Sequence, residues 1–107
     1  MNVESKFVWH QGKLVPYEKA TIHFLNTSFH YGTGVFEGLR AYDTSKGPAI
    51  FRLKDHMERL LSSAKILGVN NLPYDLDTLM ESCKEVVKAN DLKEAYIRPM
   101  FYAREGG

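Results

Sequence analysis

One stretch of the chain carries most of the side chains that could do chemistry: His30-Tyr31-Gly32-Thr33-Gly34-Val35-Phe36-Glu37-Gly38-Leu39-Arg40-Ala41-Tyr42. It holds three glycines within seven residues, and each costs a strand about 0.5–1 kcal/mol relative to alanine. Such glycines are typical where the backbone closely approaches a ligand or another segment. The aromatic and ionisable side chains between them could line a pocket for a small, polar, planar molecule. A loop followed by an ordinary strand fits the spacing equally well.

A second group of polar side chains lies on the last predicted strand, Ala95–Tyr102. Strand alternation sets Tyr96 and Arg98 on one face, about 6–7 Å apart along the strand. Arg40 and Tyr42 make the same combination on the earlier strand. Because a guanidinium binds carboxylate or phosphate through paired hydrogen bonds, two such strands would form a wall that binds anions.

Two β-hairpins are predicted, the first from Phe7–His10 and Lys13–Pro16 and the second from Val35–Tyr42 and Ala49–Arg52. The first turns at Gln11-Gly12, where glycine in second place is a hairpin signal. The second turns through the cluster Asp43–Pro48. Ala20–Phe29 alternates poorly, so we expect it to be irregular.

Apolar residues at helical spacing predict two helices, Leu53–Leu67 and Leu76–Ala89. Gly68 is expected to end the first helix. Asp75 is expected to cap the second, and Asn90 to end it in the left-handed region. Cys83 falls on the apolar face of the second helix, so it is predicted to be a packing residue.

Arg59 lies on the first helix, about 135° from the apolar stripe at 100° per residue. The pattern alone favours a solvated surface arginine at this position.

The order of elements predicts a single α+β domain over residues 1–107, a mainly antiparallel sheet with two helices packed on one face. The other face would carry the Arg and Tyr side chains. It would then be a binding surface or an interface with another domain.

Composition excludes several classes of function. The net charge is +1 without a basic stripe, so nucleic acid and membrane surfaces are not expected partners. No long apolar run predicts a signal peptide or a membrane span, and the single cysteine fits a reducing cytoplasm. Nucleotide-binding glycine loops and a serine-hydrolase elbow are missing. No metal site is expected either, because the histidines lack ligand spacing: His10, His23, His30 and His56.

Three segments together resemble branched-chain amino-acid aminotransferases: residues 30–42, Phe51-Arg52-Leu53-Lys54-Asp55-His56-Met57-Glu58-Arg59-Leu60, and Ala95-Tyr96-Ile97-Arg98-Pro99. These are fold-type IV enzymes that depend on pyridoxal 5′-phosphate (PLP). The resemblance runs from about Val8 to the end of the chain. It implies the small N-terminal domain of the D-amino-acid-aminotransferase-like PLP fold.

The resemblance also implies roles for individual residues. Arg59 would bind the phosphate of PLP, which replaces the interpretation as a surface arginine. Tyr96 would bind the α-carboxylate of the substrate through its hydroxyl. Arg98 would meet the side-chain carboxylate of glutamate.

The remaining residues carried over from the family concern the substrate side chain. Phe36 and Gly38 would form the apolar pocket for leucine, isoleucine or valine, with Tyr31 beside them. Arg40 belongs to the motif and would support this group.

In this family the Schiff-base lysine lies in a larger C-terminal domain, and no lysine of this chain sits in a matching motif. We therefore expect no catalytic residue in this chain, whose last residues read like an interdomain connection, and no activity from it alone. The full enzyme would exchange an amino group between branched-chain amino acids and 2-oxoglutarate or glutamate by ping-pong chemistry. It would be a cytoplasmic homodimer or higher homo-oligomer.

Two alternatives stay open. One is another fold-type IV enzyme, such as a D-amino-acid or aromatic transaminase or an aminodeoxychorismate lyase. The other is a stand-alone binding or dimerisation module.

Overall fold

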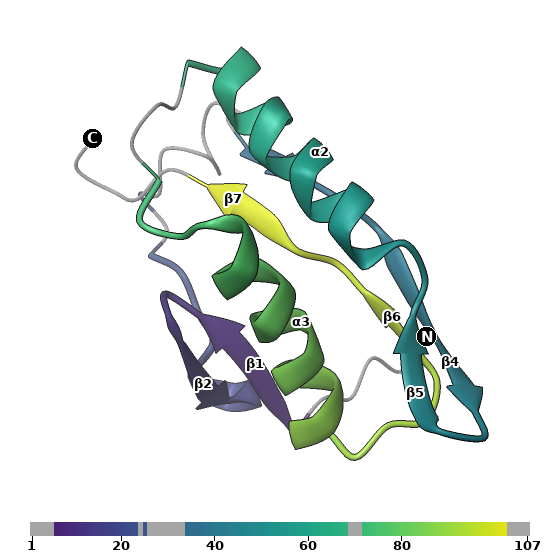
Figure 1. Ribbon diagram of the computed structural model, residues 1–107. Helices are drawn as coiled ribbons and strands as arrows, with labels where there is room; N and C mark the ends of the chain where they lie inside the picture. Colours follow the sequence, from purple (N-terminus) through teal and green to yellow (C-terminus); the bar gives the residue numbers. More distant parts are fainter. Residues whose placement is uncertain (1–5, 24, 26–33, 69–71, 103–107) are drawn as a thin grey trace.

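The computed structural model describes residues 6–23, 25, 34–68 and 72–102. Their elements follow one another along the chain as β1 (Phe7–His10), β2 (Lys13–Pro16), the 3-10 turn η1 (Tyr17–Lys19), β3 (Gly34–Phe36), β4 (Leu39–Thr44), β5 (Gly47–Ile50), α2 (Leu53–Ile66), α3 (Leu76–Ala89), β6 (Ala95–Ile97) and β7 (Met100–Tyr102). Every described strand pairing is antiparallel, and both helices lie on one side of the strands (Figure 1). The predicted α+β class is confirmed.

The strands divide among three small sheets: β1-β2, β3-β7 and β5-β4-β6. Two of these pairings share one register, because Phe36 lies opposite Met100 and Leu39 lies opposite Ile97. Two residues on each strand lie between these pairs. The chain segments around β3-β4 and β6-β7 therefore run side by side as one long ladder with an interruption in its middle.

The interruption corrects the prediction of a single strand over Ala95–Tyr102. Arg98 and Pro99 fall outside both β6 and β7. Proline has no backbone N–H and cannot complete the ladder. Its carbonyl still accepts a hydrogen bond from the Glu37 N–H at 3.0 Å, which keeps the two segments together.

Both hairpins form, and the first matches its prediction. Gln11 and Gly12 turn it with φ of 52° and 91°, the pair of positive values that a tight two-residue turn needs. The second hairpin turns more tightly than predicted. β4 continues through Thr44 and β5 begins at Gly47, so only Ser45 and Lys46 form the loop.

The helices begin and end close to the predicted residues. Asp75 caps α3 by accepting a hydrogen bond from the Thr78 N–H at 2.8 Å. Gly68, with φ of 89°, follows the end of α2. The expected left-handed Asn90 is wrong: its φ is −87°, and Asp91 has the positive φ instead.

The core lies between the helices and β4, whose Leu39 is almost fully buried. Side chains from both helices pack with it: Leu53, Met57, Leu60, Leu79 and Cys83. Burial raises the pKa of the Cys83 thiol to about 11, which fits its predicted packing role. None of the described helices is long and apolar enough to cross a membrane.

Candidate functional site

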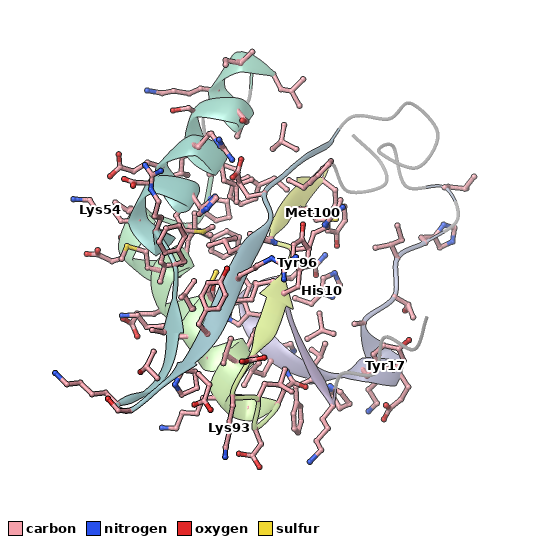
Figure 2. All side chains as sticks on the ribbon, turned by 90° about the vertical axis from the view of Figure 1, so that its right-hand side faces the viewer. His10, Tyr17, Lys54, Lys93, Tyr96 and Met100 are labelled. Carbon is pink, nitrogen blue, oxygen red and sulfur yellow. The ribbon has the colours of Figure 1, made fainter. Side chains whose placement is uncertain are left out.

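The face of the long ladder that points away from the helices carries most of the predicted site residues. Alternation along the strands of this ladder and the residues between them leaves five positions on this face: Phe36, Gly38, Arg40, Tyr96 and Arg98. We call this set the open face. Figure 2 shows Tyr96 and Met100 on the side of the strands away from α2, which carries Lys54. Phe36 and Tyr96 are each more than half exposed, so the open face is accessible over the described residues.

Arg98 connects the aromatic members of the open face. Its guanidinium carbon lies 4.6 Å from the centre of the Phe36 ring and 5.6 Å from that of Tyr96. Its Nη2 donates a hydrogen bond to the Tyr96 hydroxyl at 3.1 Å. Cation–π contacts of this kind hold a guanidinium near aromatic rings without using all of its donors. An anion can therefore still bind to Arg98.

Gly38 makes room for Tyr96. A Cβ atom built on Gly38 would lie 3.0 Å from Cζ of the Tyr96 ring and closer still to its hydroxyl. Real Cβ atoms essentially never come that close to other heavy atoms. A side chain at this position would therefore displace the phenol.

Arg40 faces the same tyrosine from β4. Its guanidinium carbon lies 5.8 Å from the centre of the Tyr96 ring. Tyr42 instead packs edge-on against Phe51, with ring centres 6.4 Å apart. The predicted wall of paired Arg and Tyr side chains thus forms from Arg40, Tyr96 and Arg98, whereas Tyr42 belongs to a neighbouring aromatic pair.

Arg59 binds the carboxylate of Glu37, one of the ionisable side chains between the glycines that were expected to line a pocket; Glu37 is instead buried in the row with Leu39 and Ala41. The Nε and Nη2 of Arg59 donate to the two oxygens of Glu37 at 2.9 and 2.7 Å. His56, one helical turn earlier, lies 2.9 Å from Glu37 Oε1 through its Nδ1. Glu37 is only 7% exposed, whereas 67% of the Arg59 side chain is exposed. Arg59 is therefore exposed, as the helix pattern predicted, and a buried carboxylate orients it.

Charge in this cluster follows from the hydrogen bonds. Those from Arg59 hold the pKa of the Glu37 carboxyl below its ordinary value, with a smaller contribution from His56, and outweigh burial, which acts the other way. The same carboxylate raises the pKa of Arg59. Glu37 is thus ionised and Arg59 charged at neutral pH.

The cluster and the open face lie on opposite sides of the same strand segment. Phe36 and Gly38 belong to the open face, while Glu37 between them is buried on the helix side with Leu39. In the sequence, Glu37 alternates with the apolar residues Val35, Leu39 and Ala41, and this pattern could have identified it. A carboxylate in a buried row needs a partner.

Tyr31 and His30 lie outside the described residues. Two other histidines have structural contacts. His10 Nε2 lies 2.5 Å from the Tyr102 hydroxyl, and His23 accepts a hydrogen bond from the Leu25 N–H. Within residues 6–23, 25, 34–68 and 72–102, no group of three histidine, cysteine or acidic side chains could hold a metal ion.

Comparison with known proteins gives a family and a set of relatives. The model of the family described as amino-transferase class IV matches residues 34–107. The chain is 50% identical to the branched-chain-amino-acid aminotransferase of Pseudomonas aeruginosa over 100 residues, and 42% identical to that of Escherichia coli K12 over 104. These alignments cover 92% and 97% of this chain. They cover 32% and 33% of the relatives, so the chain spans about a third of their length.

Solved structures agree with the sequences. The T.th. branched-chain amino acid aminotransferase, complexed with N-(5′-phosphopyridoxyl)-L-glutamate, is 43% identical, with a TM-score of 0.94 over 99% of this chain and 35% of its own. The enzyme from the archaeon Thermoproteus uzoniensis, solved with norvaline, is 46% identical, with a TM-score of 0.88 over 97% of this chain and 35% of its own. The expected fold is thereby confirmed for the part that this chain spans. Because the family model covers more than half of its residues and includes the motifs at 51–60 and 95–99, the chain belongs to the amino-transferase class IV family.

Proposed function

We propose that this chain is the N-terminal part of a PLP-dependent branched-chain-amino-acid aminotransferase. The full protein would move an amino group between leucine, isoleucine or valine and 2-oxoglutarate by ping-pong chemistry. The arrangement of Arg98, Tyr96 and Phe36 carries this proposal, because it offers a cation, a phenol and an apolar ring at one place. The names of the similar enzymes support the same substrates.

The residues fit a phosphate-bearing cofactor at Arg59. A guanidinium carries five N–H donors, and the hydrogen bonds to Glu37 use two of them. The side chain is two-thirds exposed, so its other donors can bind a phosphate. PLP, when bound, supplies the electron sink that stabilises negative charge at the α-carbon of the amino acid.

The open face would orient the amino acid. The Tyr96 hydroxyl would donate a hydrogen bond to the α-carboxylate, and Arg98 would form an ion pair with the side-chain carboxylate of glutamate. When leucine occupies the site, Arg98 would keep its contact with the Phe36 ring. One surface would thereby accept both an aliphatic and an anionic side chain.

The aliphatic side chain would lie against Phe36, beside Gly38 and the predicted Tyr31. Arg40, whose guanidinium carbon lies 5.8 Å from the centre of the Tyr96 ring, would support the phenol. The part of the protein beyond this chain would supply the lysine that forms the Schiff base and most other contacts to PLP. We therefore expect this chain alone to be inactive. The full, active protein is expected to be a cytoplasmic homodimer or higher homo-oligomer.

Steady-state kinetics of the Arg98→Ala variant of the full-length protein test this proposal. A hydrogen bond to a charged group contributes about 1.5–3 kcal/mol. The KM for glutamate should therefore rise roughly tenfold or more, while the KM for leucine changes little. Lys54→Ala, an exposed change on α2, is the control and should leave both KM values unchanged. Equal losses for leucine and glutamate would contradict the role given to Arg98.

A further inference from the structure

Glu37 is a buried charge that the proposed roles of the open face do not use. Its carboxylate is 7% exposed and lies in the row of residues along the β3-β4 segment that faces the helices. A buried carboxylate is stable only where it is paired and hydrogen-bonded. Here both oxygens accept hydrogen bonds from Arg59, and one also contacts His56.

The geometry of the pair favours an orienting role over simple packing. Two parallel hydrogen bonds to one carboxylate fix the plane of a guanidinium as well as its position. His56 and Arg59 lie one turn apart on α2, so the same carboxylate also fixes the rotation of the helix. The Arg59 side chain nevertheless remains two-thirds exposed, which leaves its outer edge accessible. An apolar pair would join helix and strand at least as well.

Glu37 is also built into the open face through its backbone. Its N–H donates to the Pro99 carbonyl at 3.0 Å, and its neighbours Phe36 and Gly38 are members of that face. The residue therefore joins the two segments of the long ladder at their interruption. A shift of Glu37 would move Arg59 and the open face together.

We propose that Glu37 is a positioning residue that holds Arg59 in the orientation that binds the cofactor phosphate. Glu37 also links Arg59 to the open face. The inference rests on the proposed function, in which Arg59 binds PLP through its phosphate. It makes a specific claim about ligands. Removing the carboxylate should weaken the binding of phosphate-bearing ligands and leave the binding of their phosphate-free counterparts unchanged.

The test measures dissociation constants of the full-length apoenzyme for PLP and for pyridoxal, which lacks the phosphate. The Glu37→Gln variant keeps the size of the side chain and removes its charge. We expect its dissociation constant for PLP to rise about tenfold, the lower end of the loss seen when the orienting partner of a metal ligand is removed. The value for pyridoxal should stay within about twofold of wild type. Glu58→Gln, an exposed change on α2 next to Arg59, should alter neither dissociation constant.

Three further measurements distinguish a positioning role of Glu37 from a purely structural one. In the Arg59→Gln variant, adding Glu37→Gln should not weaken PLP binding further, because the guanidinium that Glu37 orients is already absent. Should Glu37→Gln not fold, Glu37→Asp keeps the charge and shortens the side chain by one methylene, and it should give a smaller loss confined to PLP. Competition by inorganic phosphate against PLP should weaken in both variants.

Equal losses for PLP and pyridoxal, or none for PLP, would overturn the positioning role while leaving the proposed function intact. A wild-type protein that binds neither compound would instead contradict the proposed function itself. The two failures are therefore distinguishable in one experiment.

Discussion

The Tyr96 hydroxyl lies over the backbone of Gly38, in the space that any other residue at position 38 would fill with its Cβ atom. This contact joins β6 to the segment between β3 and β4 on the open face. It gives the glycine a role that the resemblance alone did not suggest. Gly38 sets the position of the phenol, in addition to any contact with the substrate side chain.

The Gly38→Ala variant should therefore impair every substrate to a similar degree. Displacing the phenol would weaken the proposed hydrogen bond from Tyr96 to the α-carboxylate, a group that leucine, valine and glutamate share. Such a bond to a charged group contributes about 1.5–3 kcal/mol, so the KM of each should rise roughly tenfold or more. The double variant Gly38→Ala, Tyr96→Phe should be little worse than Tyr96→Phe alone. Losses confined to the longest aliphatic substrates would show that Gly38 acts only as a pocket wall.

Asn90 should be a main determinant of how the N-terminal hairpin docks on α3. Its amide accepts from the Lys6 and Phe7 N–H groups at 2.6 and 2.9 Å and donates to the Phe7 and Val86 carbonyls. It is 7% exposed. Asn90→Ala would remove these part-buried hydrogen bonds, each of which contributes about 0.5–1.5 kcal/mol to stability.

We expect this variant of the full-length protein to have a lower Tm and faster hydrogen exchange at the Phe7 amide. Exposed Glu94→Ala is the control. Unchanged exchange at Phe7 in Asn90→Ala would mean that the strand pairing of β1 with β2 holds the hairpin in place by itself.

The pairing of Glu37 predicts a change of stability in acid. The pKa of Glu37 is lowered in the folded protein. The ionised carboxylate therefore adds to the free energy of unfolding above its ordinary pKa of 4.5, and this stabilisation is lost as the pH falls through the folded pKa. The difference in Tm between wild type and Glu37→Gln should therefore be largest near neutral pH and shrink in acid. The difference between wild type and Glu58→Gln should vary less with pH. A Tm difference between wild type and Glu37→Gln that stays constant down to low pH would be inconsistent with an ionised, paired carboxylate.

The sequence predicted best where a local signal decides the structure. The capping Asp75 with its apolar stripe predicted α3, and Gln11-Gly12 predicted the first turn, because both depend on residues adjacent in the chain. Asn90 was misjudged because its amide is recruited by the backbone of Lys6 and Phe7, more than 80 residues away. That contact depends on how the hairpin packs against the helix, which a local pattern does not contain.

The same distinction applies to the site. Alternation correctly assigned Tyr96 and Arg98 to one face, where Arg98 donates a hydrogen bond to the Tyr96 hydroxyl. The helix pattern predicted that Arg59 is exposed but not that it pairs with Glu37, because Glu37 lies 22 positions earlier. Pro99 interrupts the predicted strand because proline has no backbone N–H, and the Pro99 carbonyl still accepts a hydrogen bond from the Glu37 N–H. The binding roles given to Tyr31, to Arg59 and to the residues of the open face stay predictions.

The most direct test of the proposed function is the amino-acid specificity of the full-length protein loaded with PLP. With 2-oxoglutarate as acceptor, glutamate should form from L-leucine, L-isoleucine and L-valine, and far more slowly from D-alanine or L-phenylalanine. Formation of D-glutamate from D-amino acids, preference for aromatic substrates, or no transfer from L-leucine would contradict the account.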